Sequence, residues 1–274
     1  MWNSIIEHFQ TLEDRPVERS AILAGLLLVF WIIEGVIPLM PGRYKKTRIR
    51  HAGLNLIFWS FFLLIHFVLA IFIVMLSDWC RDNHFGLVYW LNAGVALTLI
   101  ISLLAQDLGN YIAHFILHKV RFLWPMHIIH HSDNNVDVTT GFRHHPLDSF
   151  SRGVFFVLMI GVSGAPMYAV MIYQTLAAFF TLFTHSNISL PPKLDRAISY
   201  FFVSPNMHKV HHHRVQPYTD SNYGDVFALW DRLFGTYRKL DPKDIDYGLD
   251  RYYPNEKDED FVALIKKPFQ KLDS

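Results

Sequence analysis

The chain has 274 residues, of which 51% are hydrophobic, 15% aromatic and only 18% charged, and this apolar excess predicts membrane segments. Lys and Arg number 25 against 24 Asp and Glu, and this near-neutral balance argues against nucleic acid as a partner. The single cysteine, Cys80, excludes an internal disulfide and a cysteine-ligated zinc or iron–sulfur cluster within the chain, so we expect a buried thiol.

Three apolar stretches near the start of the chain predict membrane-spanning helices. An acid-rich N-terminal preface, residues 1–20, comes before them and does not resemble a cleavable signal peptide. The stretches cover residues 21–40, 54–76 and 87–105. Two ionisable residues lie inside these ranges. We expect Glu34 to face the helix bundle, and His66 either to line a substrate path or to hydrogen-bond a neighbouring helix.

A cluster of cations indicates which membrane face carries the site. It follows the first stretch and consists of Arg43, Lys45, Lys46, Arg48 and Arg50. Such density next to two spans marks a cytoplasmic loop. The second stretch would then cross the membrane away from the cytoplasm, and the third would cross it back. The segment after residue 105 is therefore predicted to lie at the cytoplasmic face of a bacterial inner membrane or of the endoplasmic reticulum.

A fourth apolar run covers residues 154–183. It has to begin and end on the same side of the membrane if the histidines before and after it share one site. Its thirty residues of helix would span about 45 Å, which is less than two full crossings require. Gly161, Gly164 and Pro166 break the run where a hairpin would bend. We therefore predict two short, tilted helices within residues 147–184.

These elements divide the chain into four parts: the preface 1–20, the transmembrane helices 21–105, a catalytic domain 106–240 that includes the hairpin 147–184, and a soluble tail 241–274. The chain is polar from Pro191 onward, and the charged tail is expected to be solvated. The fold class is therefore predicted to be all-α: an integral membrane bundle of three spans and a short hairpin, with a cytoplasmic histidine-rich helical cap.

Twelve of the sixteen histidines lie between residues 114 and 213, and most form three clusters with spacings of three or four. On a helix these spacings place imidazoles on one face, where they can bind a metal. The clusters are His114 and His118; His127, His130 and His131; and His208, His211 and His212. Eight such ligands exceed the coordination of one ion, so the sequence predicts a two-metal site.

The local sequence around the clusters predicts helices that present them. Asp107 and Tyr111 precede His114 and His118 on one helical stripe, where Asp107 could orient a ligand of a neighbouring helix or could cap a helix. Prolines predict the first turns of the helices that carry the other two clusters, after Trp124 and after Ser204.

The remaining histidines are assigned from their position in the chain. One of the adjacent pair His144 and His145 is expected to face the site, and His185 emerges from the hairpin at the same membrane face. His213 points about 100° away from His212 on a helix. Three further histidines have no partner nearby in the sequence and are interpreted as surface residues: His8, His51 and His84.

Histidine ligands alone do not decide between zinc, iron, copper and nickel. A structural zinc site would need only four ligands and would be closed. The larger number of histidines, next to a membrane and without a hydrolytic nucleophile motif, favours two redox-active irons that activate dioxygen against an unactivated C–H bond of an apolar substrate.

Taken together, the motifs resemble the fatty acid hydroxylase and sterol desaturase superfamily. The resemblance rests on H-x-x-x-H, two copies of H-x-x-H-H, and the connecting stretches R-H-H-P at residues 143–146, H-S-N at 185–187, D-S-N-Y-G at 220–224 and L-W-D-R-L-F-G-T-Y at 229–237. It implies an integral-membrane, oxygen-dependent enzyme with a histidine-ligated di-iron centre. The ligands it implies are His114, His118, His127, His130, His131, His145, His185, His208, His211 and His212.

The resemblance also implies supporting residues and partners. Asp107, Asn187 and Asp225 are expected to support the ligands, and a purely structural role for Asp225 is an equal alternative. We expect a lipid substrate (sterol, fatty acyl chain or ether lipid) and a separate electron donor such as cytochrome b5, a ferredoxin or a reductase. The chain departs from some relatives because it carries no cytochrome b5 segment, and because Thr181 stands where a fourth H-x-x-x-H would begin.

Hydroxylation is the first prediction for the reaction, and desaturation of the same substrate class is the second, because both begin with hydrogen abstraction. A membrane zinc-handling protein and a catalytically inactive scaffold are the alternatives from other classes. A zinc transporter would place its ligands inside the spans, whereas here the clusters lie outside them.

Overall fold

The computed structural model describes residues 2–40, 47–250 and 260–269, and these residues are helical, with isolated β-bridges in place of extended strands. The first half contains α1 (Trp2–Thr11), α2 (Pro16–Val36), α3 (Arg48–Asp82), α4 (Leu87–Trp90), α5 (Val95–Lys119) and α6 (Trp124–His131). The second half contains α7 (Pro146–Ser163), α8 (Met167–His185), α9 (Pro192–Ile198), α10 (Pro205–His211), α11 (Leu229–Leu233) and α12 (Phe261–Lys266). Short 3-10 turns connect them, among them η2 (Val138–Phe142) and η5 (Lys267–Phe269).

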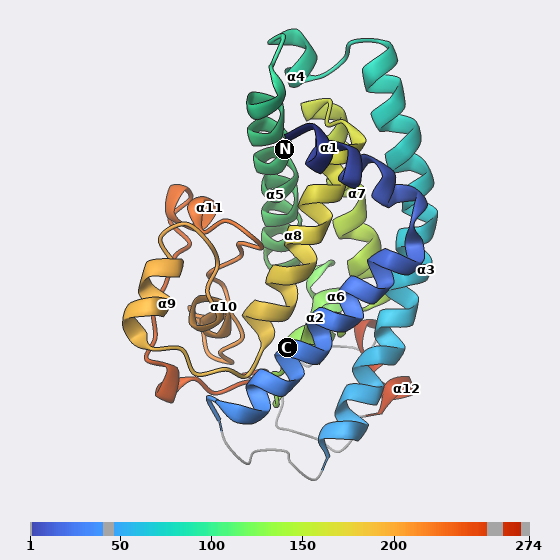
Figure 1. The fold of residues 1–274 in the computed structure, drawn as a ribbon. Helices are drawn as coiled ribbons and strands as arrows, with labels where there is room; N and C mark the ends of the chain where they lie inside the picture. The colour runs from blue at the N-terminus through green and yellow to red at the C-terminus, as the bar shows by residue number, and fades with distance from the viewer. Residues whose placement is uncertain (1, 41–46, 251–259, 270–274) are drawn as a thin grey trace.

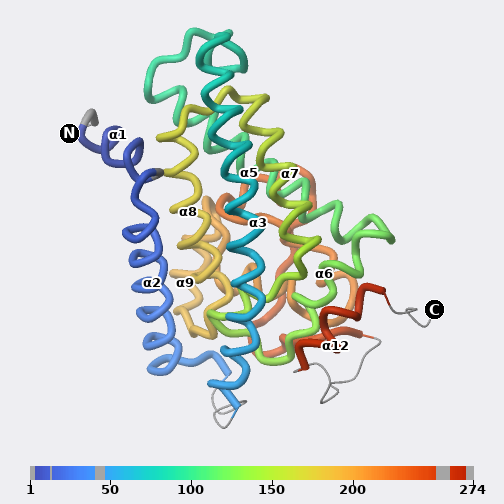
Figure 2. Tube along the Cα trace, turned by 90° about the vertical axis from the view of Figure 1, so that its right-hand side faces the viewer, coloured from blue at the N-terminus to red at the C-terminus, as the bar shows by residue number. Residues whose placement is uncertain are grey.

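Long helices form a bundle, and a lobe of short helices lies beside one end of it (Figure 1). Helix α7 packs between α3 and α5, while α2 runs obliquely across α8 (Figures 1 and 2). Among the described residues, five helices are long and apolar enough to cross a membrane: α2, α3, α5, α7 and α8. This agrees with the predicted all-helical membrane protein.

The first three predicted spans are found, with shifted bounds. Helix α3 is much longer than the predicted span, and α5 begins at Val95 rather than at residue 87, because a turn with Gly94 as N-cap separates it from α4. Helix α5 runs without a break to Lys119, so the third span continues directly into the first histidine cluster. Arg43, Lys45 and Lys46 of the predicted cytoplasmic loop lie outside the described residues.

The predicted hairpin is confirmed, but its helices are not short. The helices α7 and α8 have 18 and 19 residues because α7 begins at Pro146, eight residues before the apolar run. The bend falls at Gly164, whose φ of 71° is left-handed and where a Cβ would lie 2.5 Å from the Phe85 carbonyl oxygen. These bounds agree with the predicted hairpin range, residues 147–184, although each of the two helices is long and apolar enough to cross a membrane.

Polar side chains are buried where α2 and α3 meet η2. Glu34 is 3% exposed, pairs with Arg48 at 2.6 Å and accepts hydrogen bonds from the Val138 and Asn187 amides, as expected of a carboxylate that faces the bundle. The interpretation of His51 as a surface residue was wrong. Its Nε2 lies 3.2 Å from Asp133 Oδ2 inside the protein. The expectation for Cys80 is confirmed, because the thiol is buried.

The end of the chain departs from the predicted solvated tail. Residues 260–269 dock beside α6, at the lower right of Figure 2. Leu264 is fully buried, and Phe261 packs against Phe58 of α3 with ring centroids 5.3 Å apart. The prediction failed here because it rested on the run of charges at residues 255–260. A short amphipathic helix, α12, follows that run immediately and packs against the bundle. The charges at residues 255–259 lie outside the described residues, and the four-part division of the chain stays a prediction.

Candidate metal centre

Nine of the histidines converge into two groups at the end of the bundle where α5 finishes and α8 finishes. Within each group the ring nitrogens that could serve as ligands all lie within 4.8 Å of one another. The five-histidine group consists of His114, His118, His127, His131 and His211. The four-histidine group consists of His130, His185, His208 and His212.

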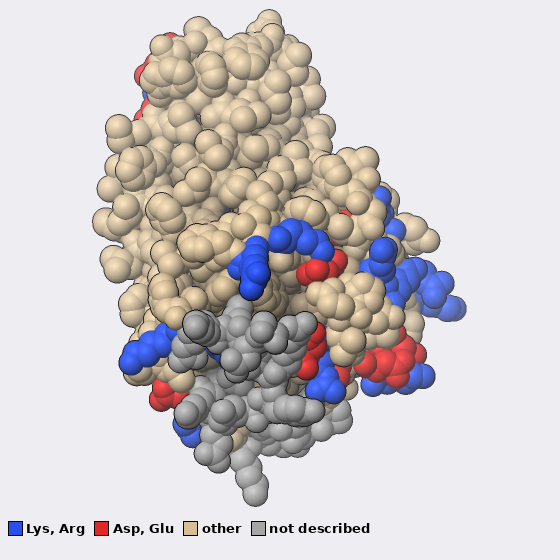
Figure 3. Space-filling model, turned by 180° about the vertical axis from the view of Figure 1, so that it is seen from behind, with Lys and Arg blue, Asp and Glu red and all other residues tan. Residues whose placement is uncertain are grey.

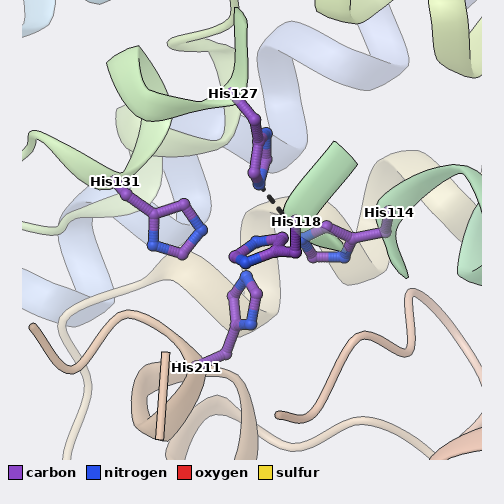
Figure 4. A group of neighbouring side chains, drawn as sticks. All are labelled: His114, His118, His127, His131 and His211. Carbon is purple, nitrogen blue, oxygen red and sulfur yellow. Dashed lines mark hydrogen bonds between the residues drawn. The ribbon is translucent and has the colours of Figure 1, made fainter. Parts of the chain in front are cut away.

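The five-histidine group draws on three helices, whose side chains point toward one common centre (Figure 4). His114 and His118 come from the last turns of α5, one helical turn apart. Pro125 stands in the first turn of α6 and lets that helix begin so that His127 and His131 face α5, and His211 ends α10. The Nε2 atoms of His114 and His127 are 3.1 Å apart.

The four-histidine group lies directly beside the first. Nε2 of His185, at the end of α8, is 3.2 Å from Nε2 of His130 and 3.0 Å from Nε2 of His208. His212 completes the group and stacks on His131 of the five-histidine group, with ring centroids 4.8 Å apart. Neighbouring residues of α6 and α10 thus serve different groups, because consecutive helical residues point about 100° apart.

The protonation of these histidines suits metal binding. Burial lowers the pKa of His127 to about 3, although Asp148 acts in the opposite direction. Burial and the neighbouring imidazoles hold the pKa values of five more histidines well below the ordinary value: His130, His131, His208, His211 and His212. The rings are therefore neutral at pH 7, which is the form that binds a metal.

The donor set fits metal ions. Several buried ring nitrogens have no hydrogen-bond partner among the described residues, including Nε2 of His118 and His211 and both nitrogens of His131 and His212. Unpaired buried nitrogens are costly unless something else binds them. The nitrogen–nitrogen separations near 3 Å also match two ligands on one ion, since metal–nitrogen bonds of about 2.1 Å at angles of 90–109° place the nitrogens about 3.0–3.4 Å apart.

The outer nitrogens of four of the five rings in the five-histidine group are fixed by acceptors. Three of these acceptors come from one short segment, the residue 220–224 loop. His118 Nδ1 lies 3.2 Å from Asp220 Oδ1, and His114 Nδ1 is 2.9 Å from the Tyr223 carbonyl oxygen. The third contact joins His211 Nδ1 to the Ser221 carbonyl oxygen at 2.7 Å. Acceptors at Nδ1 fix the tautomer and the ring orientation and leave Nε2 free for a metal.

The residue 220–224 loop is itself held in place by buried side chains. Asp231 accepts hydrogen bonds from the amides of Tyr223 and Gly224, each at 2.8 Å. Asn222, which has a φ of 53°, donates to the carbonyls of Met207 and Arg238. The two carbonyl groups that orient histidines therefore belong to a rigid loop.

Asp148, at the start of α7, supports the centre from the opposite side. It is fully buried and accepts from His127 Nδ1 at 2.8 Å and from His144 Nδ1 at 2.9 Å. Arg152 donates to its other oxygen at 3.0 Å. His144 stacks on His130 with centroids 4.3 Å apart, so this carboxylate connects the two groups.

The four-histidine group is anchored less. His185 Nδ1 is 2.7 Å from the Thr181 carbonyl oxygen. In contrast, Nδ1 of His130, His208 and His212 finds no hydrogen-bond partner within the described part of the chain. The two groups therefore differ both in the number of histidines and in how firmly the rings are oriented.

Comparison with known proteins agrees with this geometry. The model of the fatty acid hydroxylase family matches residues 99–236, about half of the chain, and this range contains every histidine of both groups. The chain belongs to the fatty acid hydroxylase family.

Relatives of this family member are named as a hydroxylase, a monooxygenase and a desaturase. The ornithine lipid hydroxylase OlsE of Rhizobium tropici is 26% identical over 69% of this chain and 54% of its own length. The alkylglycerol monooxygenase of Homo sapiens is 28% identical over 88% of this chain and 52% of its own length. A Delta(7)-sterol 5(6)-desaturase of Saccharomyces cerevisiae is 28% identical over 49% of this chain and 34% of its own length. The chain thus spans about half the length of the first two relatives, and no solved structure matches it.

One predicted ligand of this hydroxylase-family chain, His145, lies outside both histidine groups. His145 belongs to neither group: its Nδ1 accepts a hydrogen bond from the Leu147 amide as N-cap of α7, and its ring lies 6.0 Å from that of Phe269. The partner in the adjacent pair that faces the site is His144, which stacks on His130. In the structure His145, the residue before Pro146, caps the helix, so its assignment as a ligand stays a prediction that this geometry does not favour.

The three predicted supporting residues have no hydrogen bond to a histidine of either group. Asp107 accepts from the amides of Val226 and Phe227 and from two side chains, and so holds the chain that follows the residue 220–224 loop. Asn187 pairs with the backbone of Met40, and Asp225 with Asn110.

Sequence reasoning missed the residues that do contact the histidines. Asp220 stood inside a quoted motif without a role, and nothing in the local pattern marks a carboxylate as an acceptor for a histidine about a hundred residues away. Asp148 had a usable signal, because it follows His144 by four residues, the spacing that puts both on one face of a helix.

Replacing Asp220 with Asn should weaken metal binding at the five-histidine group by about 10- to 100-fold, the usual effect of losing an outer-shell carboxylate. Hydrogen bonds from His118 and Lys119 hold the pKa of Asp220 below its usual range in spite of burial, so the native acceptor is charged. Metal content measured during titration with a chelator tests this expectation. Ser221→Ala is the matched control, because His211 uses only the Ser221 carbonyl. Equal chelator resistance in both variants would contradict the assigned role.

Proposed function

We propose that the protein is a membrane-bound, dioxygen-dependent oxidoreductase that hydroxylates a C–H bond of a lipid. The observation that carries the proposal is the pair of adjacent histidine groups at the end of a bundle of apolar helices. The proposed ligands are the nine histidines of the two groups, and the proposed cofactor is two iron ions. When bound, such irons supply the redox chemistry that activates dioxygen toward an unactivated C–H bond.

The chain's own residues perform four tasks in this proposal. Neutral imidazoles bind the metals, and burial keeps bulk water away from them. Asp148, Asp220 and the carbonyls of the residue 220–224 loop set the directions of four rings in the five-histidine group. The apolar helices around the centre give an apolar substrate a route from the bilayer.

The names of the relatives narrow the proposed substrate to membrane lipids. One relative is named for ornithine lipids and another for alkylglycerols, which are ether lipids. Electrons would come from a separate donor of the cytochrome b5, ferredoxin or reductase type. We place the active site on the cytoplasmic face, as the cations Arg48 and Arg50 at the start of α3 suggest.

Desaturation of the same substrate class is the second candidate, and the sterol desaturase among the relatives favours keeping it. Lipids from cells that express the chain separate the two. Hydroxylation adds one oxygen atom that carries label from 18O2, whereas desaturation removes two hydrogens and incorporates no label. A cell line that expresses His130→Ala serves as the inactive control. Identical lipids in the active and control cells would contradict both candidates.

The metal is tested on purified full-length protein from cells grown with iron-57. We expect two irons per chain and a Mössbauer spectrum of two coupled, inequivalent sites, because the two groups differ in ligand number and support. Protein that takes up zinc alone, and that refuses iron on reconstitution, would contradict redox catalysis and would favour a zinc-handling or scaffold role.

A further inference from the structure

The lobe beside the bundle exposes large apolar side chains on one surface, which we call the apolar rim. It consists of Tyr200, Phe201, Leu229, Leu233 and Phe234, with exposed fractions of 61%, 73%, 44%, 64% and 55%. Hydrogen bonds between backbones, such as that from the Ala228 amide to the Phe201 carbonyl oxygen, join the two segments that carry it. This density of exposed aromatic and aliphatic residues does not fit a surface that faces water.

The segments that carry the rim pack against the membrane-spanning helices rather than beyond their ends. Phe234 stacks on Tyr111 of α5 with ring centroids 5.3 Å apart. Tyr111 lies eight residues before the end of α5, which corresponds to about 12 Å along the helix axis. On the next helix, Phe202 stacks on Phe180 of α8 at 5.2 Å. The rim therefore lies level with the apolar parts of both helices.

The rim also continues a surface that is already apolar. Leu97 and Ile100, on the first turns of α5, are 45% and 54% exposed, and α11 covers the following turns of the same helix through Trp230. Seen from behind, the upper part of the molecule is nearly free of charged side chains, whereas Lys, Arg, Asp and Glu gather over the lower part, including the lobe (Figure 3). Helix α11, which carries part of the rim, lies at the upper end of the lobe, on the side of the uncharged region (Figure 1).

A cation lies at the edge of the rim between two tyrosine rings, one of which is the rim residue Tyr200, in the manner of a membrane interface. The Arg232 guanidinium lies over the rings of Tyr237 and Tyr200, 4.3 and 5.5 Å from their centroids. Its Nη2 donates to the Ser199 carbonyl oxygen, which fixes its position. Tyrosine and arginine at this boundary are typical of residues at the level of lipid headgroups.

We propose that the apolar rim is immersed in the lipid bilayer, with its aromatic and leucine side chains among acyl chains and Arg232 at the headgroups. The lobe, which the sequence predicts to be soluble from Pro191 onward, is then an interfacial membrane element. The membrane surrounds the metal centre on this side as well as along the spans.

The test uses full-length protein reconstituted in lipid nanodiscs. Cys80, the single native cysteine, is replaced by Ser, and single cysteines labelled with an environment-sensitive fluorophore are placed at Phe201 and at Leu233. Ile71→Cys, at a 53% exposed position in the middle of α3, is the reference for lipid contact. Lys243→Cys, whose native side chain is 75% exposed, is the reference for water.

Probes at 201 and 233 should be quenched by brominated lipids as the probe at 71 is, and most strongly when the bromines lie near the headgroup. They should lose the iodide quenching that the probe at 243 retains. Iodide quenching equal to that at 243 would overturn the proposal. Protection from both quenchers, with cross-linking that grows with protein concentration, would assign the rim to a second copy of the chain instead. The two positions are independent, and metal content confirms that each variant is folded.

Discussion

Alanine at His211 should remove one of the two proposed metals, and alanine at the next residue, His212, should remove the other. His211 belongs to the five-histidine group and His212 to the four-histidine group, although His211 is the last residue of α10 and His212 is the C-cap residue that follows it. Each variant should retain one metal per chain and lose more than about a hundredfold of its turnover, since removing a ligand exceeds the loss caused by removing its support. Metal analysis and iron-57 Mössbauer spectra should show a different surviving site in the two variants.

His213→Ala is the matched control for this pair. It is the third consecutive histidine, but its Nδ1 accepts a hydrogen bond from the Asp246 amide and it lies in neither group. It should keep both metals and full turnover. Loss of both metals from His211→Ala and His212→Ala alike, with intact folding, would contradict two separate groups.

The unequal support of the groups adds a second readout to the same experiment. Within the described part of the chain, four of the five rings in the five-histidine group have a hydrogen-bond partner at Nδ1. In the four-histidine group one ring of four, His185, has such a partner. A metal in the four-histidine group should therefore leave first when a chelator is added to the native protein. His212→Ala should then resemble the partly depleted native protein in its spectrum, and His211→Ala should not.

How far the sequence predicts the fold depends on the range of the interaction that shapes each element. The hairpin bend at Gly164 and the helix starts at Pro125 and Pro205 were predictable because local backbone chemistry determines them. The docking of Leu264 was not. It depends on side chains that pack across long sequence separations, and no local pattern encodes these contacts.

The same distinction applies to the site. Eight histidines were assigned by spacing alone, because a helix converts a spacing of three or four into a shared face. The position of His145 outside both groups was not predictable, because its contact as the N-cap of α7 shows only in the structure. Asp220 and Tyr223 lie about a hundred residues along the chain from the histidines they contact, and Ser221 lies ten residues from His211. Spacing on a helix therefore does not connect these acceptors with their histidines.

Replacing Asp107 with Asn should be strongly destabilising, although it changes a single atom of a residue that has no hydrogen bond to either histidine group. The Asp107 carboxylate is fully buried and accepts four hydrogen bonds. One oxygen accepts from Tyr173 and the Val226 amide, and the other from the Phe227 amide and the Trp230 indole. An amide NH2 in place of either oxygen would face two donors. Two unsatisfied buried donors cost about 2–6 kcal/mol in total.

The expected result is a lower unfolding temperature in detergent together with loss of metal, because the chain that Asp107 holds continues from the residue 220–224 loop that orients three histidines. Asp225→Asn is the matched control. Its Oδ2 accepts from the Asn110 side chain at 3.0 Å, and the amide oxygen of Asn can accept the same bond. The control should remain near native in stability and metal content. If Asp107→Asn were as stable as Asp225→Asn, the four hydrogen bonds would not hold the loop. If it were destabilised but kept both metals, the loop would not orient the histidines.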